Sequence, residues 1–200
     1  MVQGDERLAP EELSITVLFT DIAGFTSLAE RLSAPEAAAF LNEHFRLLAA
    51  CVEAEQGTID KFIGDSLMAF WGAPEAQPDQ AARACRAARA MAAAIVADNR
   101  HRREHGLEPV RIRLGVHSGP AIVGNIGAPG RINYTIVGDA VNTAQRIENI
   151  AREHMAKDDE VIVLASEAVL RSADASCAAR LIGKYTLRGR RGATNIFRLH

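Results

Sequence analysis

The sequence has few cysteines, and none is spaced as metal-binding or redox cysteines usually are. Its 200 residues include three, Cys51, Cys85 and Cys177. No two of them form a CxxC motif, so neither a zinc site nor a disulfide framework is expected. Buried, reduced thiols are the simpler interpretation, and they fit a protein of the cytoplasm, where thiols stay reduced.

The chain also lacks an excess of charge of one sign and an uninterrupted hydrophobic run. Its 23 basic and 25 acidic side chains leave a net charge of −2, which argues against a nucleic-acid partner or an anionic membrane surface. The most apolar long stretch, 81–97, contains three arginines and therefore does not predict a membrane span. The polar, acidic start of the chain does not have the pattern of a signal peptide.

The composition is that of one globular domain. Apolar residues make up 48% and charged residues 24%, which is enough for a proper core at this length. We expect an N-terminal extension over 1–13 and a single domain over 14–200.

Hydrophobic periodicity and turn residues predict the order of the elements. Strands are expected at 14–20, 58–63, 67–71, 110–118, 121–126, 132–137, 161–165, 179–187 and 194–199. Helices are expected at 26–32, from a capping box at Ser33 to Gly57, at 79–105, at 138–153 and after Ser166. This order predicts an α+β fold of ferredoxin-like or polymerase-palm type, with a largely antiparallel sheet and helices on one face. A turn at Gly119-Pro120 would make 119–137 an extra β-hairpin arm.

Two aspartates are the first candidates for chemistry. Asp21 closes strand 14–20, and Asp65 lies in the turn after strand 58–63. If those strands are neighbours, the two carboxylates share one end of the sheet, where they would repel each other unless a divalent cation lies between them. An ordinary pair of turn aspartates is the alternative. Five residues form a strand-to-helix turn that can aim N–H groups at phosphate oxygens: Ile22, Ala23, Gly24, Phe25 and Thr26.

Three segments resemble the signature segments of one family. They are FTDIAGFT at 19–26, KFIGDSLMAFWG at 61–72 and YTIVGDAVNTAQRIE at 134–148. They are similar to the class III nucleotidyl cyclases, the catalytic domains of adenylyl and guanylyl cyclases. The similarity extends from about 14 to 199, and three ordered motifs are a more specific signal than a single glycine-rich loop.

The resemblance implies a reaction and a metal site. ATP would be converted to 3′,5′-cyclic AMP and pyrophosphate, by attack of the ribose 3′-hydroxyl on the α-phosphate. Two Mg²⁺ or Mn²⁺ ions would be held by Asp21 and Asp65 with help from the Ile22 carbonyl, which is two-metal chemistry. Asn142 and Arg146 match the family's transition-state pair, in which Asn142 would orient the ribose and Arg146 would stabilise the transition state. The two are spaced i, i+4, so both project from one helix face. A surface Arg146 paired with Glu148 or Asp139 is the alternative.

The resemblance also implies base recognition and a dimer. Lys61 matches the lysine that contacts N1 of adenine, and Arg188 loosely matches a lysine that grips the terminal phosphates. Asp21 and Asp65 of one protomer would face residues of the other, so a head-to-tail homodimer would hold two equivalent sites. The residues from the other protomer would be Lys61, Thr135, Asn142, Arg146 and Arg188.

Thr135 is where the sequence departs from many adenylyl cyclases, which have aspartate there. Its hydroxyl can accept from an adenine amino group or donate to a guanine carbonyl, so a guanylyl or dual-specificity cyclase stays open. The Lys61/Thr135 combination resembles the adenylyl cyclases that respond to bicarbonate or CO₂.

A catalytically silent dimerisation or nucleotide-sensing module is a further alternative. A diguanylate cyclase or polymerase is disfavoured because no GGDEF-like turn is present. Such cyclases are often fused to sensor domains outside the catalytic chain.

Overall fold

The chain folds around one eight-stranded sheet. The structure is a computed structural model that describes residues 9–173, 177–187 and 192–200. Its strands and helices are β1 (Glu11–Ile22), α1 (Phe25–Ala29), α2 (Ala34–Ala54), β2 (Thr58–Ile63), β3 (Ser66–Trp71), α3 (Gln80–Glu104), β4 (Ile112–Ala128), β5 (Arg131–Val137), α4 (Asp139–His154), β6 (Val161–Ser166), α5 (Glu167–Ser172), β7 (Ala179–Thr186) and β8 (Ala193–Leu199).

The strand order is β2-β3-β1-β4-β6-β8-β7, and β5 pairs with β4 outside this path. Every pair is antiparallel except β4 with β6. The expected α+β fold with a mostly antiparallel sheet is therefore confirmed. None of the helices in the described ranges is long and apolar enough to cross a membrane.

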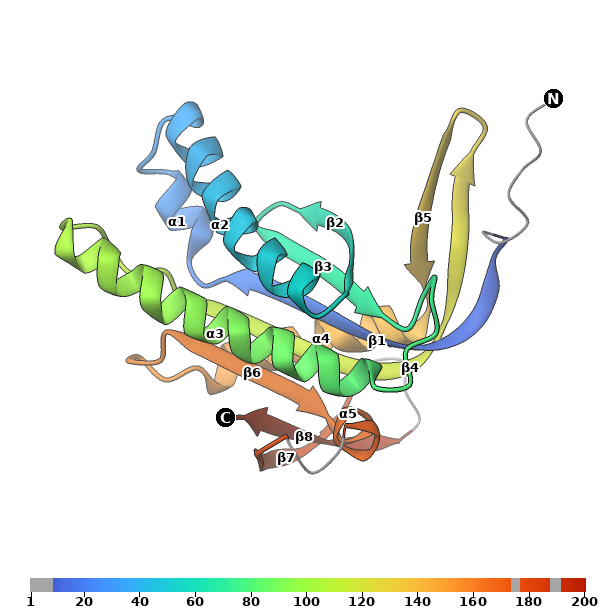
Figure 1. Ribbon diagram of the computed structural model, residues 1–200. Helices are drawn as coiled ribbons and strands as arrows, with labels where there is room; N and C mark the ends of the chain where they lie inside the picture. Colours follow the sequence, from blue (N-terminus) through green and yellow to red (C-terminus); the bar gives the residue numbers. More distant parts are fainter. Residues whose placement is uncertain (1–8, 174–176, 188–191) are drawn as a thin grey trace.

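The helices cover both faces of the sheet, so the expectation that they pack on one face is wrong. α2 and α3 lie in front of the sheet, and α4 lies behind it (Figure 1). Successive residues of β1 point to opposite faces: Leu18 joins the cluster with α2 and α3, while Val17 and Phe19 join Ala144 of α4. A strand that is apolar on both sides needs cover on both sides.

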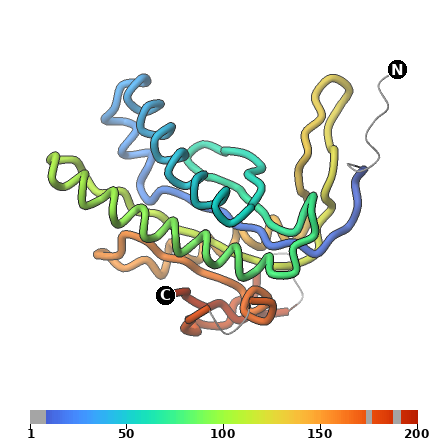
Figure 2. Tube along the Cα trace, viewed as in Figure 1, coloured from blue at the N-terminus to red at the C-terminus, as the bar shows by residue number. Residues whose placement is uncertain are grey.

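β4 is one continuous strand, so the turn expected at Gly119-Pro120 is also wrong. Gly119 lies opposite Ile15 and Pro120 opposite Ser14 of β1. β6 pairs with β4 only as far as Val116, and the pairing with β5 begins later in β4. Along the side of β4 away from β1, Pro120 has no strand partner among the described residues, so its missing N–H breaks no ladder bond there. The outer half of β4 and β5 form a hairpin that stands out from the sheet (Figure 2).

The start of α2 follows the sequence closely. Ser33 is the N-cap, and its N–H donates to the Glu36 carboxylate at 2.8 Å, which completes the expected capping box. α1 is shorter than expected and ends at Ala29.

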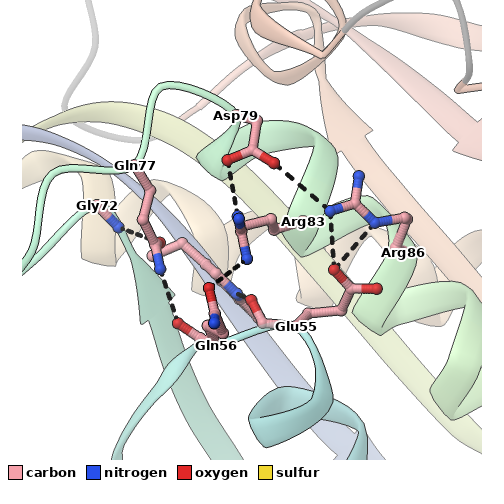
Figure 3. Close-up of polar contacts among 8 residues, drawn as sticks. Glu55, Gln56, Gly72, Gln77, Asp79, Arg83 and Arg86 are labelled. Atoms are coloured by element: carbon pink, nitrogen blue, oxygen red, sulfur yellow. Dashed lines mark hydrogen bonds and ion pairs between the residues drawn. The ribbon is translucent and has the colours of Figure 1, made fainter.

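A polar network joins the end of α2 to the start of α3 (Figure 3). Arg83 donates to Asp79 and to the side chain of Gln56, each at 2.7 Å. Arg86 donates to Glu55 at 2.9 Å. These bonds fix α3 against the connection that leads from α2 into the β2–β3 hairpin.

Candidate active site

The structure brings Asp21 and Asp65 together at one end of the sheet. Asp21 lies near the end of β1, and Asp65 lies in the turn between β2 and β3. β3 is the antiparallel neighbour of β1. The Asp65 carboxylate accepts a hydrogen bond from the Ile22 N–H at 3.1 Å, so the turn that carries Asp65 is attached to the end of β1.

The negative charge of Asp21 acts on the neighbouring Asp65 carboxyl. Burial raises the pKa of Asp65, and the negative charge of Asp21 raises it further. Repulsion of this kind favours a bound cation. Among the described residues there is no group of three or more His, Cys, Asp or Glu side chains placed to hold a metal ion. Two carboxylates suffice for magnesium, which takes much of its shell from water and phosphate, so Asp21 and Asp65 fit such an ion.

An arginine that the sequence analysis did not single out lies beside this pair. Arg113 of β4 is directly opposite Asp21 in the strand register, and the two form an ion pair. The Nε of Arg113 also donates to Glu148 of α4 at 3.0 Å. Burial, and then the charge of Asp21, raises the pKa of Glu148 to about 7. The carboxylates of Asp21 and Glu148 thus share one guanidinium, whose charge also acts on Asp65.

A cavity of about 300 Å³ opens in front of these groups. Asp21, Asp65, Arg113 and Glu148 are among its lining residues, together with most of the strand-to-helix turn. The turn residues that line it are Ile22, Gly24, Phe25 and Thr26. Ala23 instead lines a neighbouring cavity with Arg31 and Arg111. Gly24 has φ +80°, a left-handed conformation that glycine adopts without steric cost, and it starts α1 at the edge of the cavity.

Lys61 and Thr135 form a second group. The ammonium of Lys61 on β2 donates to the Thr135 hydroxyl on β5 at 3.1 Å. The same hydroxyl donates to the carboxylate of Asp60 at 2.9 Å. The structure therefore joins the two expected base-reading residues and adds Asp60, which sequence reasoning missed although it directly precedes Lys61. None of these three residues lines the cavity at Asp21.

Asn142 and Arg146 lie on α4, on the surface of the chain. Asn142 is exposed and Arg146 is half-buried. Within the described ranges, neither side chain has a hydrogen bond or ion pair, and neither lines the cavity at Asp21. Glu148, one of the two partners considered for Arg146, is paired with Arg113 instead. Arg188 lies outside the described residues.

The comparisons with known proteins identify the family of the chain. The family profile for the adenylate and guanylate cyclase catalytic domain matches residues 9–200. The chain belongs to this family. Adenylate cyclase 1 of Rhizobium meliloti (strain 1021) is 41% identical over 183 residues, which is 92% of this chain and 27% of that protein. The adenylate cyclase of Anabaena cylindrica is 32% identical over 205 residues, which is 98% of this chain and 39% of that protein. The chain thus spans well under half the length of these curated relatives.

Solved cyclase structures have the same fold. The adenylyl cyclase CyaB from P. aeruginosa matches with a TM-score of 0.87 and 31% identity over 96% of both chains. The guanylyl cyclase Cya2 matches with a TM-score of 0.83 and 30% identity, over 95% of this chain and 93% of that one. Because enzymes of both names match at similar identity, the likeness identifies the cyclase family and leaves the choice of base to the residues of the site.

Proposed function

We propose that this cyclase domain converts ATP to 3′,5′-cyclic AMP and pyrophosphate. The observation that carries the proposal is the pair of Asp21 and Asp65 in one cavity, together with a Lys61–Thr135 contact that suits adenine. The Lys61 ammonium can donate to N1 of adenine, which accepts, whereas N1 of guanine carries a proton and would oppose it.

The cavity residues fit the handling of a triphosphate. Asp21, Asp65 and the Ile22 carbonyl would hold two Mg²⁺ or Mn²⁺ ions, which activate the ribose 3′-hydroxyl and neutralise phosphate charge when bound. Arg113, beside these carboxylates, and the backbone N–H groups of the turn would bind phosphate oxygens. The 3′-hydroxyl would release its proton to water as its oxygen bonds to the α-phosphorus, and the bond from that phosphorus to the leaving pyrophosphate would break.

Asn142 and Arg146 would serve this reaction from a second copy of the chain. Asn142 would orient the ribose, and Arg146 would donate to the charged oxygens around the α-phosphorus. Within the described ranges both side chains are without partners, and neither lines the cavity of its own chain. This is the arrangement expected of residues that complete a partner's site. Arg188 is proposed as an aid in binding the terminal phosphates.

A head-to-tail homodimer would unite the two groups in two equivalent sites. The β4–β5 hairpin supports this assembly because its apolar side chains Ile122, Ile132 and Val137 are 45%, 60% and 40% exposed. Exposed apolar side chains on a projecting hairpin are suited to covering by a second chain.

Mixing two inactive variants tests the shared site. Asp21→Ala and Arg146→Ala should each form no cyclic AMP when alone, and activity should return on mixing, because a mixed dimer contains one intact site. Arg171→Ala, which changes an exposed arginine of α5, is the matched control and should keep full activity. A verified mixed dimer that stays inactive would exclude shared sites.

Competition between ATP and GTP tests the choice of base. Cyclic AMP in clear excess supports an adenylyl cyclase, and comparable cyclic GMP would favour the guanylyl or dual-specificity alternative. A folded, dimeric protein that forms neither product with Mg²⁺ or Mn²⁺ would favour the silent nucleotide-sensing module.

Regulation is proposed on the Lys61/Thr135 pair alone. Bicarbonate or CO₂ would raise the rate of cyclic AMP formation, and the enzyme would act in the cytoplasm. In a longer protein, a fused sensor domain would also regulate this rate. A rate that bicarbonate leaves unchanged, at constant pH and ionic strength, would rule out this effector.

A further inference from the structure

Asp60 and Lys61 are neighbours in β2, yet both reach the same atom. Successive side chains of a regular strand point to opposite faces. The β2–β3 register shifts between Ile59 and Lys61, which is a β-bulge, and a bulge redirects the side chains beside it. The bulge lets the Asp60 carboxylate and the Lys61 ammonium meet the Thr135 hydroxyl at 2.9 and 3.1 Å.

These two contacts use the Thr135 hydroxyl in a defined way. A hydroxyl has one proton to donate and two lone pairs that accept. Its proton goes to Asp60, and one lone pair accepts from Lys61. Toward any further group, Thr135 can therefore act only as an acceptor.

The Asp60 carboxylate accepts from Thr135 at a buried position beside a cation. Its side chain is 1% exposed and lies 3.7 Å from the Lys61 ammonium. Burial raises the pKa of Asp60, while the Thr135 hydroxyl, the charge of Lys61 and the Ile136 N–H oppose that rise. In the hydrogen-bond geometry, the Thr135 hydroxyl donates and the Asp60 carboxylate accepts.

We propose that Asp60 sets the preference for adenine by holding the Thr135 hydroxyl as an acceptor toward the base. An adenine amino group can donate to the Thr135 lone pair that now accepts from Lys61. The Lys61 ammonium is then free to donate to N1 of adenine. The guanine carbonyl would meet a lone pair instead of a proton. The inference rests on the proposed function and resolves the ambiguity of a threonine at this position. Asp60 is a positioning residue, because it acts through Thr135.

Asp60→Asn tests the proposal with little change of shape. The amide of the variant keeps one accepting oxygen and replaces the other carboxylate oxygen by an NH₂ group, which donates. If its NH₂ group faces Thr135, the threonine proton is released toward the base. The ratio of kcat/KM for ATP to that for GTP should fall by about three- to tenfold, the range of one net hydrogen bond. Asp158→Asn, the same change at an exposed aspartate, is the control and should keep the ratio.

A double-mutant cycle separates this role from a general loss of structure. Thr135→Val removes the hydroxyl and should also lower the ratio. Adding Asp60→Asn to Thr135→Val should then lower it no further, because the two residues act through one hydroxyl. Additive effects, or an Asp60→Asn ratio equal to that of the unchanged protein, would overturn the proposal. If Asp60→Asn does not fold, Asp60→Ser, which is also uncharged, is held to the same expectations.

Equilibrium binding gives a readout that does not depend on turnover. Nucleotides without the attacking hydroxyl, 3′-deoxy-ATP and 3′-deoxy-GTP, are titrated by calorimetry into the unchanged protein and Asp60→Asn. The ratio of the affinity for 3′-deoxy-ATP to that for 3′-deoxy-GTP should be smaller in the variant. An unchanged ratio would overturn the proposal. If the unchanged protein binds both compounds but forms no cyclic product, the proposed function fails while the role of Asp60 is still decided.

Discussion

Replacing Glu148 by glutamine should stabilise the fold at alkaline pH. Glu148 is 7% exposed, and burial followed by the charge of Asp21 raises its pKa from 4.5 to about 7. The folded chain therefore holds this proton more tightly than the unfolded chain. Ionisation of Glu148 lowers the free energy of unfolding as the pH rises from about 4.5 to about 7, and the loss then stays constant. The difference between the two pKa values corresponds to a loss of at most about 3 kcal/mol in the free energy of unfolding.

Glutamine keeps the shape of the protonated side chain and cannot ionise. Near pH 5 the two free energies of unfolding should differ by less than about 1 kcal/mol, because the folded chain still holds the Glu148 proton and only the unfolded chain has begun to release it. At pH 8 the variant should be more stable by about 2–3 kcal/mol. Urea unfolding followed by circular dichroism at pH 5, 6, 7 and 8, without added metal, measures the difference at each pH.

The control is Glu153→Gln, which makes the same change at an exposed position of α4. The free energy of unfolding of this variant should differ from that of the unchanged protein by the same amount at each pH. The reasoning is refuted if the Glu148→Gln difference is equally flat, or if the unchanged protein is the more stable one at pH 8. Either result would mean that Arg113 offsets the whole cost of burying the Glu148 charge.

Three further perturbations follow from the structure. A Cβ on Gly115 would lie 2.3 Å from the backbone nitrogen of Glu148, so Gly115→Ala should push α4 from the sheet and cost about 1–3 kcal/mol in thermal unfolding. Gly192→Ala, which meets nothing within 4 Å, should be nearly neutral, and equal losses would contradict the close approach. Ser33→Ala removes the N-cap of α2 and should cost about 1 kcal/mol in urea unfolding; no loss would mean that the cap adds no stability. Mg²⁺ should raise the Tm of the unchanged protein, and it should raise the Tm of Asp65→Asn much less. Equal Tm shifts would mean that the ion binds elsewhere.

Local features of the sequence were enough to place most of the candidate groups. The end of a β-branched run located Asp21, and a glycine turn between two short strands located Asp65. The i, i+4 spacing of Asn142 and Arg146 puts both on one helix face. These inferences succeed because strands, turns and helix faces depend on residues only a few positions apart. The resemblance to the family then implied a chemical role for each group, which spacing alone does not supply.

The tertiary structure decided which groups contact one another. Arg113 meets Asp21 across 92 positions of the chain, and it does so only because β1 and β4 pair in one particular register. In the same way, a bulge in β2 brings Asp60 to Thr135, 75 positions away, and thereby fixes the donor and acceptor roles of a hydroxyl that the sequence leaves open. Register and burial depend on the packing of the whole chain, on both faces of the sheet, so no local pattern could reveal these partners.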